Sequence, residues 1–354
     1  MDALARKFPG TCGVQPCLWN PVRRIGCGTS GNGRSRGTRT IRPDRIMARM
    51  LFACLLLASS LAASAFDTVR VAEGVYALVG DLGQRSPANL GHNMTSGFIV
   101  TGEGVVVIDT GGSLANAQAI HAAIRKVTGA PVIFAVNTGG QDHRWFGNDY
   151  FRRQGAKIVA ADSAAADMRN RGLEQVERLK PLLGDKFDGT RLAYPDTTFA
   201  QRMALPVKGM RIELIHTGGA HTAGDLLVWL PTHSIVFAGD TVLAERLLGI
   251  LPGSAGRWVK SVEYLRDTLK PRVVVPGHGR VTNLDRALRD TYDYLVFLRS
   301  AVNRRFADGA FDPVEASQNL DQSRFAYLHN YDDLGLRSRN ALAVAEEIFE
   351  ARPR

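Results

Sequence analysis

The stretch Val136–Asn148 has the sequence VNTGGQDHRWFGN, and it decides how the rest of the chain is interpreted. The apolar run Val132–Val136 predicts a buried strand, and Asn148–Gln154 predicts a helix. The stretch is therefore expected to be a loop between a strand and a helix. In α/β folds such loops meet at the carboxyl ends of the strands, where functional side chains converge. Asp142 and His143 are the candidates that this loop supplies.

Three further loops have the same character, because each follows a strand-like run and supplies a His or an Asp. Their sequences are GGAHTAGD (Gly218–Asp225), FAGD (Phe237–Asp240) and VPGHG (Val275–Gly279). They add His221, Asp240 and His278 to the candidate site.

The four loops together resemble those of the metallo-β-lactamase superfamily. That family has a loop Asn-Thr-His-x-His-x-Asp-His-x-x-Gly-Asn, then Gly-His-Thr-x-Gly, a Gly-Asp after a strand and a late Gly-His. Order, approximate spacing and preceding strands agree over about Val69–Val281. The chain departs from the pattern where Ala220 precedes His221, and where Gly139, Gly140 and Gln141 replace the first two histidines.

The resemblance implies a metal centre. It assigns as ligands Asp142 and His143 (the Asp-His pair), His221 (Gly-His-Thr), Asp240 (the bridging carboxylate) and His278 (the late histidine). Because the second of the family's two sites would keep four ligands and the first only His221, one ion is expected. Zinc is the expected metal, with iron possible, and Asp142, Asp240 and His221 are the expected catalytic residues.

Two alignments of the first loop are open. Without gaps, Asn137 and Asn148 match the family's asparagines, so His143 takes the Asp position and Arg144 the second His position. Matching Asp142 and His143 to the Asp-His pair needs one residue removed and one added. This second alignment is favoured because a cation at Arg144 would oppose a metal. Arg144 in the cavity with Asp142 turned away would instead support the ungapped alignment and a non-catalytic protein.

The expected function is that of a secreted, metal-dependent hydrolase acting on an ester, thioester or lactam carbonyl of a small molecule. An ion of the zinc type lowers the pKa of bound water to about 7, which makes hydroxide available at neutral pH. Gly139 and Gly140 are expected to leave room for water or a substrate group. Two alternatives remain: a non-catalytic binding protein, and a mono-iron oxygenase of sulfur compounds, since two histidines and a carboxylate suit non-haem iron.

The formal net charge of +10 is concentrated at the N-terminus. Residues 1–65 hold 10 basic and 2 acidic residues, whereas the remainder holds 34 basic and 32 acidic residues. A charge balance of this kind gives little support to nucleic-acid binding.

Residues 47–65 predict a secretory signal peptide: Arg49 precedes an apolar core, Leu51–Leu61, and Ala63-Ser64-Ala65 forms a cleavage site. The apolar core is too short to span a bilayer comfortably, so no stable membrane anchor is expected after cleavage. Residues 1–46 favour disorder or a start codon placed too early. All four cysteines precede Ala65, which excludes disulfides and Cys-ligated zinc from the mature chain. A periplasmic or secreted protein is expected.

Residues 66–354 are predicted to form a single α/β domain. Strands and helices alternate in two halves rich in hairpins, which favours an αββα sandwich over about Asp67–Val281, with C-terminal helices from about residue 284. A helix over Ser163–Leu183 is expected to be capped by Asp162 or Ser163. Residues 184–204 and the C-terminal helices are expected to shape the pocket. The oligomeric state is left open.

Overall fold

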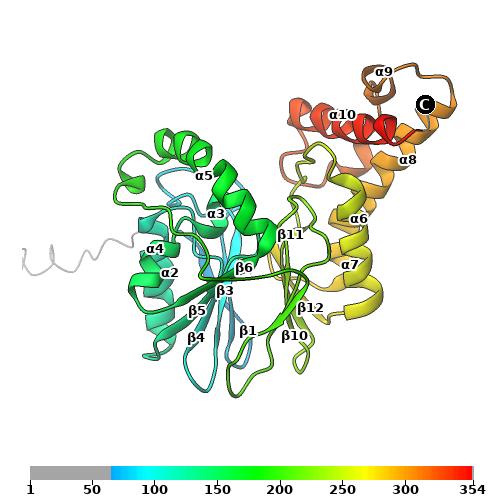
Figure 1. Cartoon of the computed structure of the whole chain (residues 1–354). Coiled ribbons are helices and arrows are strands. Elements are labelled where there is room, and N and C mark those ends of the chain that lie inside the picture. Colours follow the sequence, from blue (N-terminus) through cyan, green and yellow to red (C-terminus); the bar gives the residue numbers. More distant parts are fainter. Residues whose placement is uncertain (1–64, 353–354) are drawn as a thin grey trace, which may run out of the picture. The chain divides into compact units, whose positions relative to one another are not determined.

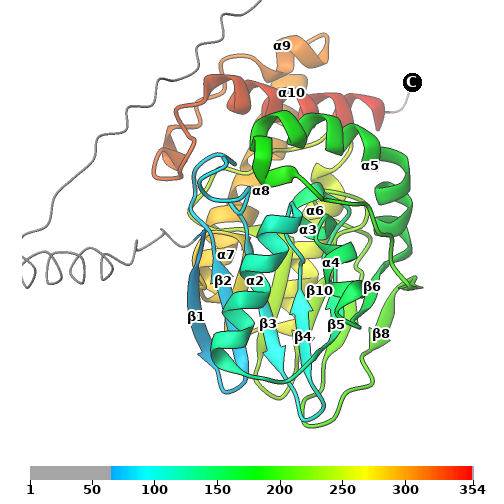
Figure 2. The same ribbon diagram turned by 90° about the vertical axis from the view of Figure 1, so that its left-hand side faces the viewer.

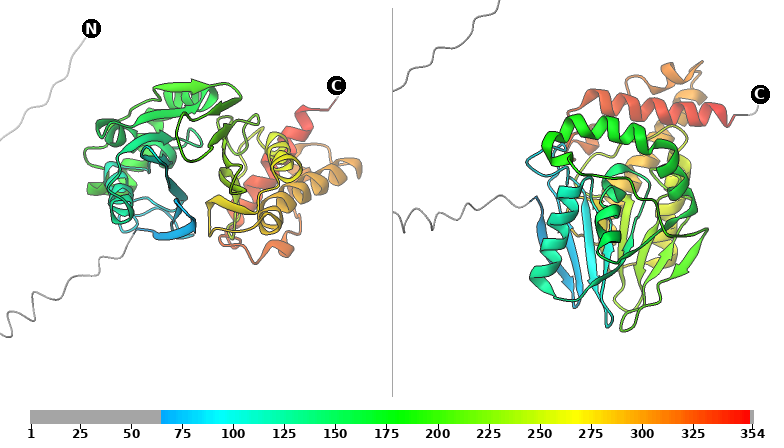
Figure 3. Two further views of the ribbon diagram at one scale, coloured as in Figure 1. Left: turned by 90° about the horizontal axis from the view of Figure 1, so that it is seen from below. Right: turned by 60° about the vertical axis from the view of Figure 1, so that its left-hand side comes forward.

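Two β-sheets pack face to face between outer layers of helices in the computed structural model, which describes residues 65–352 (Figure 1). This confirms the αββα sandwich, and Figure 3 shows the same layers from below. The described residues all belong to one compact unit. The basic N-terminal segment, the four cysteines and the predicted signal peptide up to Ser64 lie outside the described residues.

The first sheet has seven strands in sequence order. They are β1 (Asp67–Ala72), β2 (Val75–Val79), β3 (Thr95–Val100), β4 (Val105–Ile108), β5 (Val132–Val136), β6 (Lys157–Ala161) and β7 (Thr197–Phe199). Strands β1 to β4 are antiparallel neighbours, and β4 to β7 run parallel. Successive side chains point to opposite faces of a strand, so Ile99 enters the core between the sheets while Phe98 packs toward the helices.

The second sheet has five strands in the order β12-β11-β10-β9-β8. They are β8 (Arg202–Ala204), β9 (Glu213–Ile215), β10 (Leu227–Leu230), β11 (Ile235–Leu243) and β12 (Val273–His278). Phe237 of β11 packs into the core between the sheets, and Val236 packs into the outer layer. Both faces of β11 are buried, in keeping with the apolar run Ile235–Ala238 with which the strand begins.

The helices form the outer layers and a C-terminal extension (Figure 2). Those between the strands of the first sheet are α2 (Leu114–Val127), α3 (Asp142–Trp145), α4 (Asn148–Arg153), α5 (Asp162–Leu183) and η1 (Gly184–Phe187). Those after β11 are α6 (Ala255–Tyr264), η2 (Leu265–Leu269), α7 (Leu284–Ala287), η3 (Leu288–Tyr292), α8 (Asp293–Ala307), α9 (Pro313–Ser317), η4 (Ser323–Phe325) and α10 (Leu334–Glu350). Helices α6, α8 and α10 share a second apolar core around Trp258, Leu298 and Val344.

Three boundaries differ from the sequence predictions. Helix α5 has Ala161 at its N-cap and no side-chain cap, so the predicted cap is wrong; the Ser163 hydroxyl lies instead 3.2 Å from His216 Nε2. The helix predicted over Asn148–Gln154 ends one residue earlier, at Arg153. Strands β11 and β12 run on to residues 243 and 278, so Asp240 and His278 belong to strands rather than to the loops after them.

Among the residues that the structure describes, no helix is both long and apolar enough to cross a bilayer.

Candidate metal centre

The loop Asn137–Gln141 and the short helix α3 are held in place by two asparagines. Asn137 Nδ2 donates to Asn148 Oδ1, and Asn148 Nδ2 donates back to Asn137 Oδ1, both at 2.9 Å. Asn137 Nδ2 also donates to the carbonyl of Arg144 at 2.7 Å. The two ends of the loop are thus fixed, and α3 directs His143 toward the second sheet.

Asp240 and His278 reach the same point from two neighbouring strands. The parallel pairing of β11 with β12 is irregular between Phe237 and Leu243, and an irregular ladder re-aims the side chains within it. Gly239 has a φ of +49°, and a Cβ there would lie 2.5 Å from the Thr138 hydroxyl, so glycine is required.

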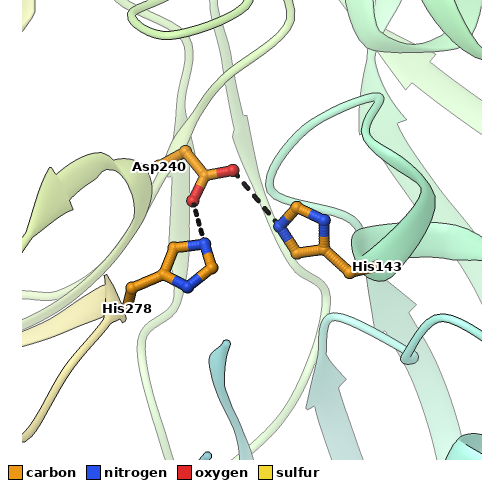
Figure 4. Close-up of side chains that lie close together, drawn as sticks. All are labelled: His143, Asp240 and His278. Atoms are coloured by element: carbon orange, nitrogen blue, oxygen red, sulfur yellow. Dashed lines mark ion pairs between the residues drawn. The ribbon is translucent and has the colours of Figure 1, made fainter. Parts of the chain in front are cut away.

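The side chains of His143, Asp240 and His278 converge, as Figure 4 shows. Ligand atoms of the three lie within 4.8 Å of one another, and all three residues are buried. His143 Nε2 lies 3.4 Å from Asp240 Oδ2, and His278 Nε2 lies 3.4 Å from Asp240 Oδ1.

Both imidazoles direct Nε2 toward this carboxylate and Nδ1 toward another oxygen acceptor. His278 Nδ1 lies 2.7 Å from the carbonyl of Asn93, which only accepts, so Nδ1 carries the proton. His143 Nδ1 lies 3.1 Å from Asp142 Oδ1 in the same way. His143 Nε2 is buried without a hydrogen-bond partner among the described residues. At 3.4 Å neither Nε2 makes a hydrogen bond of ordinary length to Asp240, so both nitrogens are placed to bind a cation between the three side chains.

The donor set fits a metal of the zinc type. Ligand bonds of about 2.1 Å in a tetrahedron keep ligand atoms about 3.4 Å apart, whereas N–H···O hydrogen bonds are about 2.7–3.2 Å long. Each histidine Nε2 lies 3.4 Å from a different oxygen of Asp240, beyond this hydrogen-bond range, and the ligand atoms of the three residues lie within 4.8 Å of one another. Burial lowers the pKa of His278 to about 4, against the opposing effect of Asp240, so its nitrogen is free to bind at neutral pH.

His221 lies outside this cluster but lines the same cavity of about 240 Å³ as Asp240 and His278. Its Nδ1 lies 2.8 Å from the carbonyl of Gly249, which leaves Nε2 unprotonated as well. Burial lowers the pKa of the half-buried His221, with Asp240 opposing the shift. His221 therefore remains neutral at the edge of the site.

The structure does not bring Asp142 to the cluster. Arg85 and Arg178 bind its carboxylate, which also accepts from the backbone N–H of His143 at 2.7 Å. Burial raises the pKa of Asp142, but His143 and the two arginines outweigh it and hold the pKa well below its usual range. Asp142 is thus an ionised carboxylate behind His143, and it orients that ring rather than joining it as a ligand.

Arg144 is buried between two carboxylates instead of pointing to solvent. It donates to Asp240 Oδ1 and, at 2.9 Å, to Asp109 Oδ2. Burial disfavours the cation, yet the two carboxylates outweigh it and raise the pKa of Arg144. A Cβ at Gly277 would lie 2.6 Å from Arg144 Nη2, so glycine makes the approach possible. The same cation holds the pKa of Asp240 well below its usual range, although burial opposes it.

These positions support the ungapped alignment and not the gapped one favoured above. His143 occupies the place expected for the Asp, and Arg144 the place of the next histidine. The expected objection to Arg144 does not apply, because two carboxylates compensate its charge. Arg144 touches Asp240 from the side of Asp109 and does not line the cavity of about 240 Å³.

The room expected at Gly139 is filled. A Cβ on Gly139 would lie 2.6 Å from Asp225 Oδ1, and Asp225 accepts from Thr222 N at 2.7 Å and from its hydroxyl at 2.6 Å. Burial, with the charge of Asp240, raises the pKa of Asp225 to about 7. Sequence reasoning passed over Asp225, although it ends the GGAHTAGD loop that was singled out.

The cavity walls come partly from unexpected segments. Residues 184–204 do not line it; Gln84, Gln141 and Arg246 do, together with residues from the start of α10. A larger cavity of about 490 Å³, between Phe66 and Arg280, contains none of the metal-centre residues.

Comparisons with known proteins place this geometry in a family. The metallo-β-lactamase superfamily matches residues 92–278, more than half of the chain. A type 2 metallo-β-lactamase of Bacteroides fragilis is 29% identical over 92 residues, which are 25% of this chain and 37% of that protein.

Two solved structures share the fold. A metallo-β-lactamase from Pontibacter korlensis has a TM-score of 0.52 at 22% identity, over 64% of this chain and 97% of that one. The inverting sec-alkylsulfatase from Pseudomonas sp. has a TM-score of 0.63 at 15% identity, over 81% of this chain and 51% of that one. At such identities the likeness concerns the fold alone.

Proposed function

Because the chain belongs to the metallo-β-lactamase superfamily, whose members are mostly metal-dependent hydrolases, we propose that it hydrolyses a carbonyl compound with one divalent ion. His143, Asp240 and His278 would hold the ion. The substrate would be an ester, thioester or lactam.

The observation that carries the proposal is the convergence of the two histidine Nε2 atoms on the carboxylate of Asp240. Asp142 and the carbonyl of Asn93 fix the tautomers from behind, as carboxylates and carbonyls do at metal-binding histidines. Three protein ligands leave a position open, which is the arrangement of catalytic rather than structural zinc sites.

Each residue has a distinct part in the proposed reaction. When bound, the ion would polarise the carbonyl and make a water-derived nucleophile available at neutral pH. Asp240 would orient that water, since Arg144 engages only its Oδ1. His221 faces the cavity with a free Nε2 and would hold the substrate or take up a proton. Asp142 would act through His143 as a positioning residue.

Two other functions are compatible with this site. Arg144 beside Asp240 and the absent first-loop histidines favour a binding protein without catalysis. Two histidines and one carboxylate also suit non-haem iron. Elemental analysis of the purified protein separates the three: about one zinc per chain supports the hydrolase, iron supports the oxygenase, and no metal supports the binding protein.

Two alanine variants test which residues hold the ion. The variant should lose tight metal binding, because only two ligands remain, whereas His221→Ala should keep the ion and lose hydrolysis. Unchanged metal content in His278→Ala would refute the assigned ligands.

We also propose that the protein is exported and cleaved after Ala65. N-terminal sequencing of protein from the native host tests this, and a mature chain that starts before Met47 would contradict it.

A further inference from the structure

A second cavity of about 360 Å³ adjoins the metal centre and is lined mainly by apolar side chains. One wall is the loop Gly249–Pro252, and the other is α10 of the C-terminal extension, which lies at the same end of the sandwich as α5 (Figure 2). The side chains that line this cavity and not the metal cavity include Ile250, Leu251, Leu342 and Ala343. We refer to it as the apolar cavity.

The two cavities meet. His221, Gly249, Leu336 and Arg339 line both of them. A molecule whose reacting group lies beside Asp240 can therefore extend past these shared residues into the apolar cavity. Ligand pockets commonly measure about 300–1,000 Å³ and combine apolar walls with a few polar groups, and the two cavities together have that character.

Two arginines face the metal cavity without a carboxylate partner. Arg246 is half-buried and donates to the carbonyls of Leu82 and Gly83 at 3.1 and 3.2 Å. Arg339 is exposed at the junction of the cavities. Neither forms an ion pair within residues 65–352, whereas the cavity carboxylates of Asp240 and Asp333 are engaged by Arg144 and by the N-terminus of α10. Both guanidinium groups are therefore available to pair with an anionic ligand, although the carboxylates of Asp333 and Glu346 line the same cavities.

We propose that the substrate is an amphiphilic anion: an ester with an aliphatic chain on one side of the carbonyl and an anionic group on the other. The chain occupies the apolar cavity, and the anionic group pairs with Arg246 and Arg339. This inference rests on the proposed hydrolysis. Water supplies the hydroxyl that bonds to the acyl carbon, the bond from that carbon to the ester oxygen breaks, and the released oxygen takes the remaining proton.

Binding of analogues tests the inference without turnover. N-alkylsuccinamates carry a carboxylate, an unreactive amide carbonyl and an alkyl chain, and calorimetry with the full, metal-loaded protein gives their Kd from butyl to decyl. Because each buried CH₂ contributes about 0.8 kcal/mol, Kd should fall about fourfold per CH₂ until the cavity is full. A Kd independent of chain length would overturn the inference.

Two variants on α10 form a matched pair. Leu342→Asp places a charge in the apolar cavity and should abolish the dependence on chain length. Leu334→Asp, on the same helix but 66% exposed and outside both cavities, should leave it unchanged. If Leu342→Asp does not fold, Leu251→Asp makes the same test from a position that is 37% exposed. Equal effects of the pocket and control variants would refute the assignment.

The anionic end is tested with Arg339→Gln. This change should raise the Kd of N-alkylsuccinamates by up to about fivefold, which is the scale of an exposed ion pair. The Kd of neutral N-alkylbutanamides should not change. An equal loss of affinity for the charged and the neutral analogues would refute the pairing of Arg339 with an anionic group.

Failure of the inference and failure of the proposed function are distinguishable. Hydrolysis of monoalkyl succinates at a rate independent of chain length would refute the inference and leave the hydrolase. Binding that depends on chain length in a protein without metal or turnover would refute the hydrolase and leave the pocket. Turnover of octyl sulfate but not of octyl succinate would overturn the carbonyl assignment.

Discussion

Replacing Gly139 by alanine should destabilise the protein by about 2–4 kcal/mol. The added Cβ would lie 2.6 Å from Asp225 Oδ1, and that carboxylate is buried and held by two hydrogen bonds from Thr222. Moving it breaks one or both bonds, and each buried partner left unsatisfied costs about 1–3 kcal/mol. Urea unfolding followed by circular dichroism measures the change.

A double-mutant cycle makes this prediction specific. In an Asp225→Ala background the carboxylate is gone, so Gly139→Ala should cost less than about 1 kcal/mol, and the two changes should be non-additive. Gly129→Ala is the control, because a Cβ there meets nothing within 4 Å. Additive effects, or a Gly139→Ala protein as stable as the control, would refute the idea that Asp225 fills the place of the missing imidazole.

Three further changes test other parts of the site. Asp142→Asn should weaken metal affinity about 10–100-fold without changing the stoichiometry, since Asp142 orients a ligand; titration with zinc measures this, and complete loss of binding would make Asp142 a ligand. Arg144→Met should lower the free energy of unfolding by about 3–5 kcal/mol, because it leaves buried carboxylates unpaired, and added metal should recover part of it in thermal melts; a neutral effect would contradict the buried ion pairs. Burial lowers the pKa of His92 to about 4, with its hydrogen bonds opposing, so the folded protein binds this proton less readily than the unfolded chain. The contribution of neutral His92 to the free energy of unfolding is fully present above about pH 6.5 and falls by about 3 kcal/mol as the pH drops toward 4. Unfolding curves of His92→Asn measured over this pH range should lack that part of the pH dependence.

The fold was accessible from the sequence because strand and helix periods in this chain are strong. The strand predicted over Val132–Val136 has those bounds in the structure, and the helix predicted over Ser163–Leu183 ends at Leu183 and begins one residue earlier. The errors occur where tertiary contacts compete with local signals. Ser163 has the chemistry of an N-cap, but it meets His216 instead, and no local pattern in the sequence contains that contact.

The candidate site was only partly accessible. His143, Asp240 and His278 were identified because each lies beside a strand in a glycine-containing segment. The choice between Asp142 and Arg144 depended on which side chain a single turn of helix directs at Asp240, and the sequence does not contain that rotation. A local rule against cations near a metal was misleading here, because the compensating charge of Asp109 comes from 35 residues away in the chain.

The ion pairs of Arg144 have a consequence for the behaviour of the protein under chelation. Asp109 follows β4 of the first sheet and Asp240 belongs to β11 of the second, so Arg144 fastens the two sheets together without any ion. Removing the metal should then leave the sandwich closed. Amide hydrogens of β4 and β11 should exchange with solvent deuterium at the same rates before and after chelation, while those of α3 exchange faster once His143 is released.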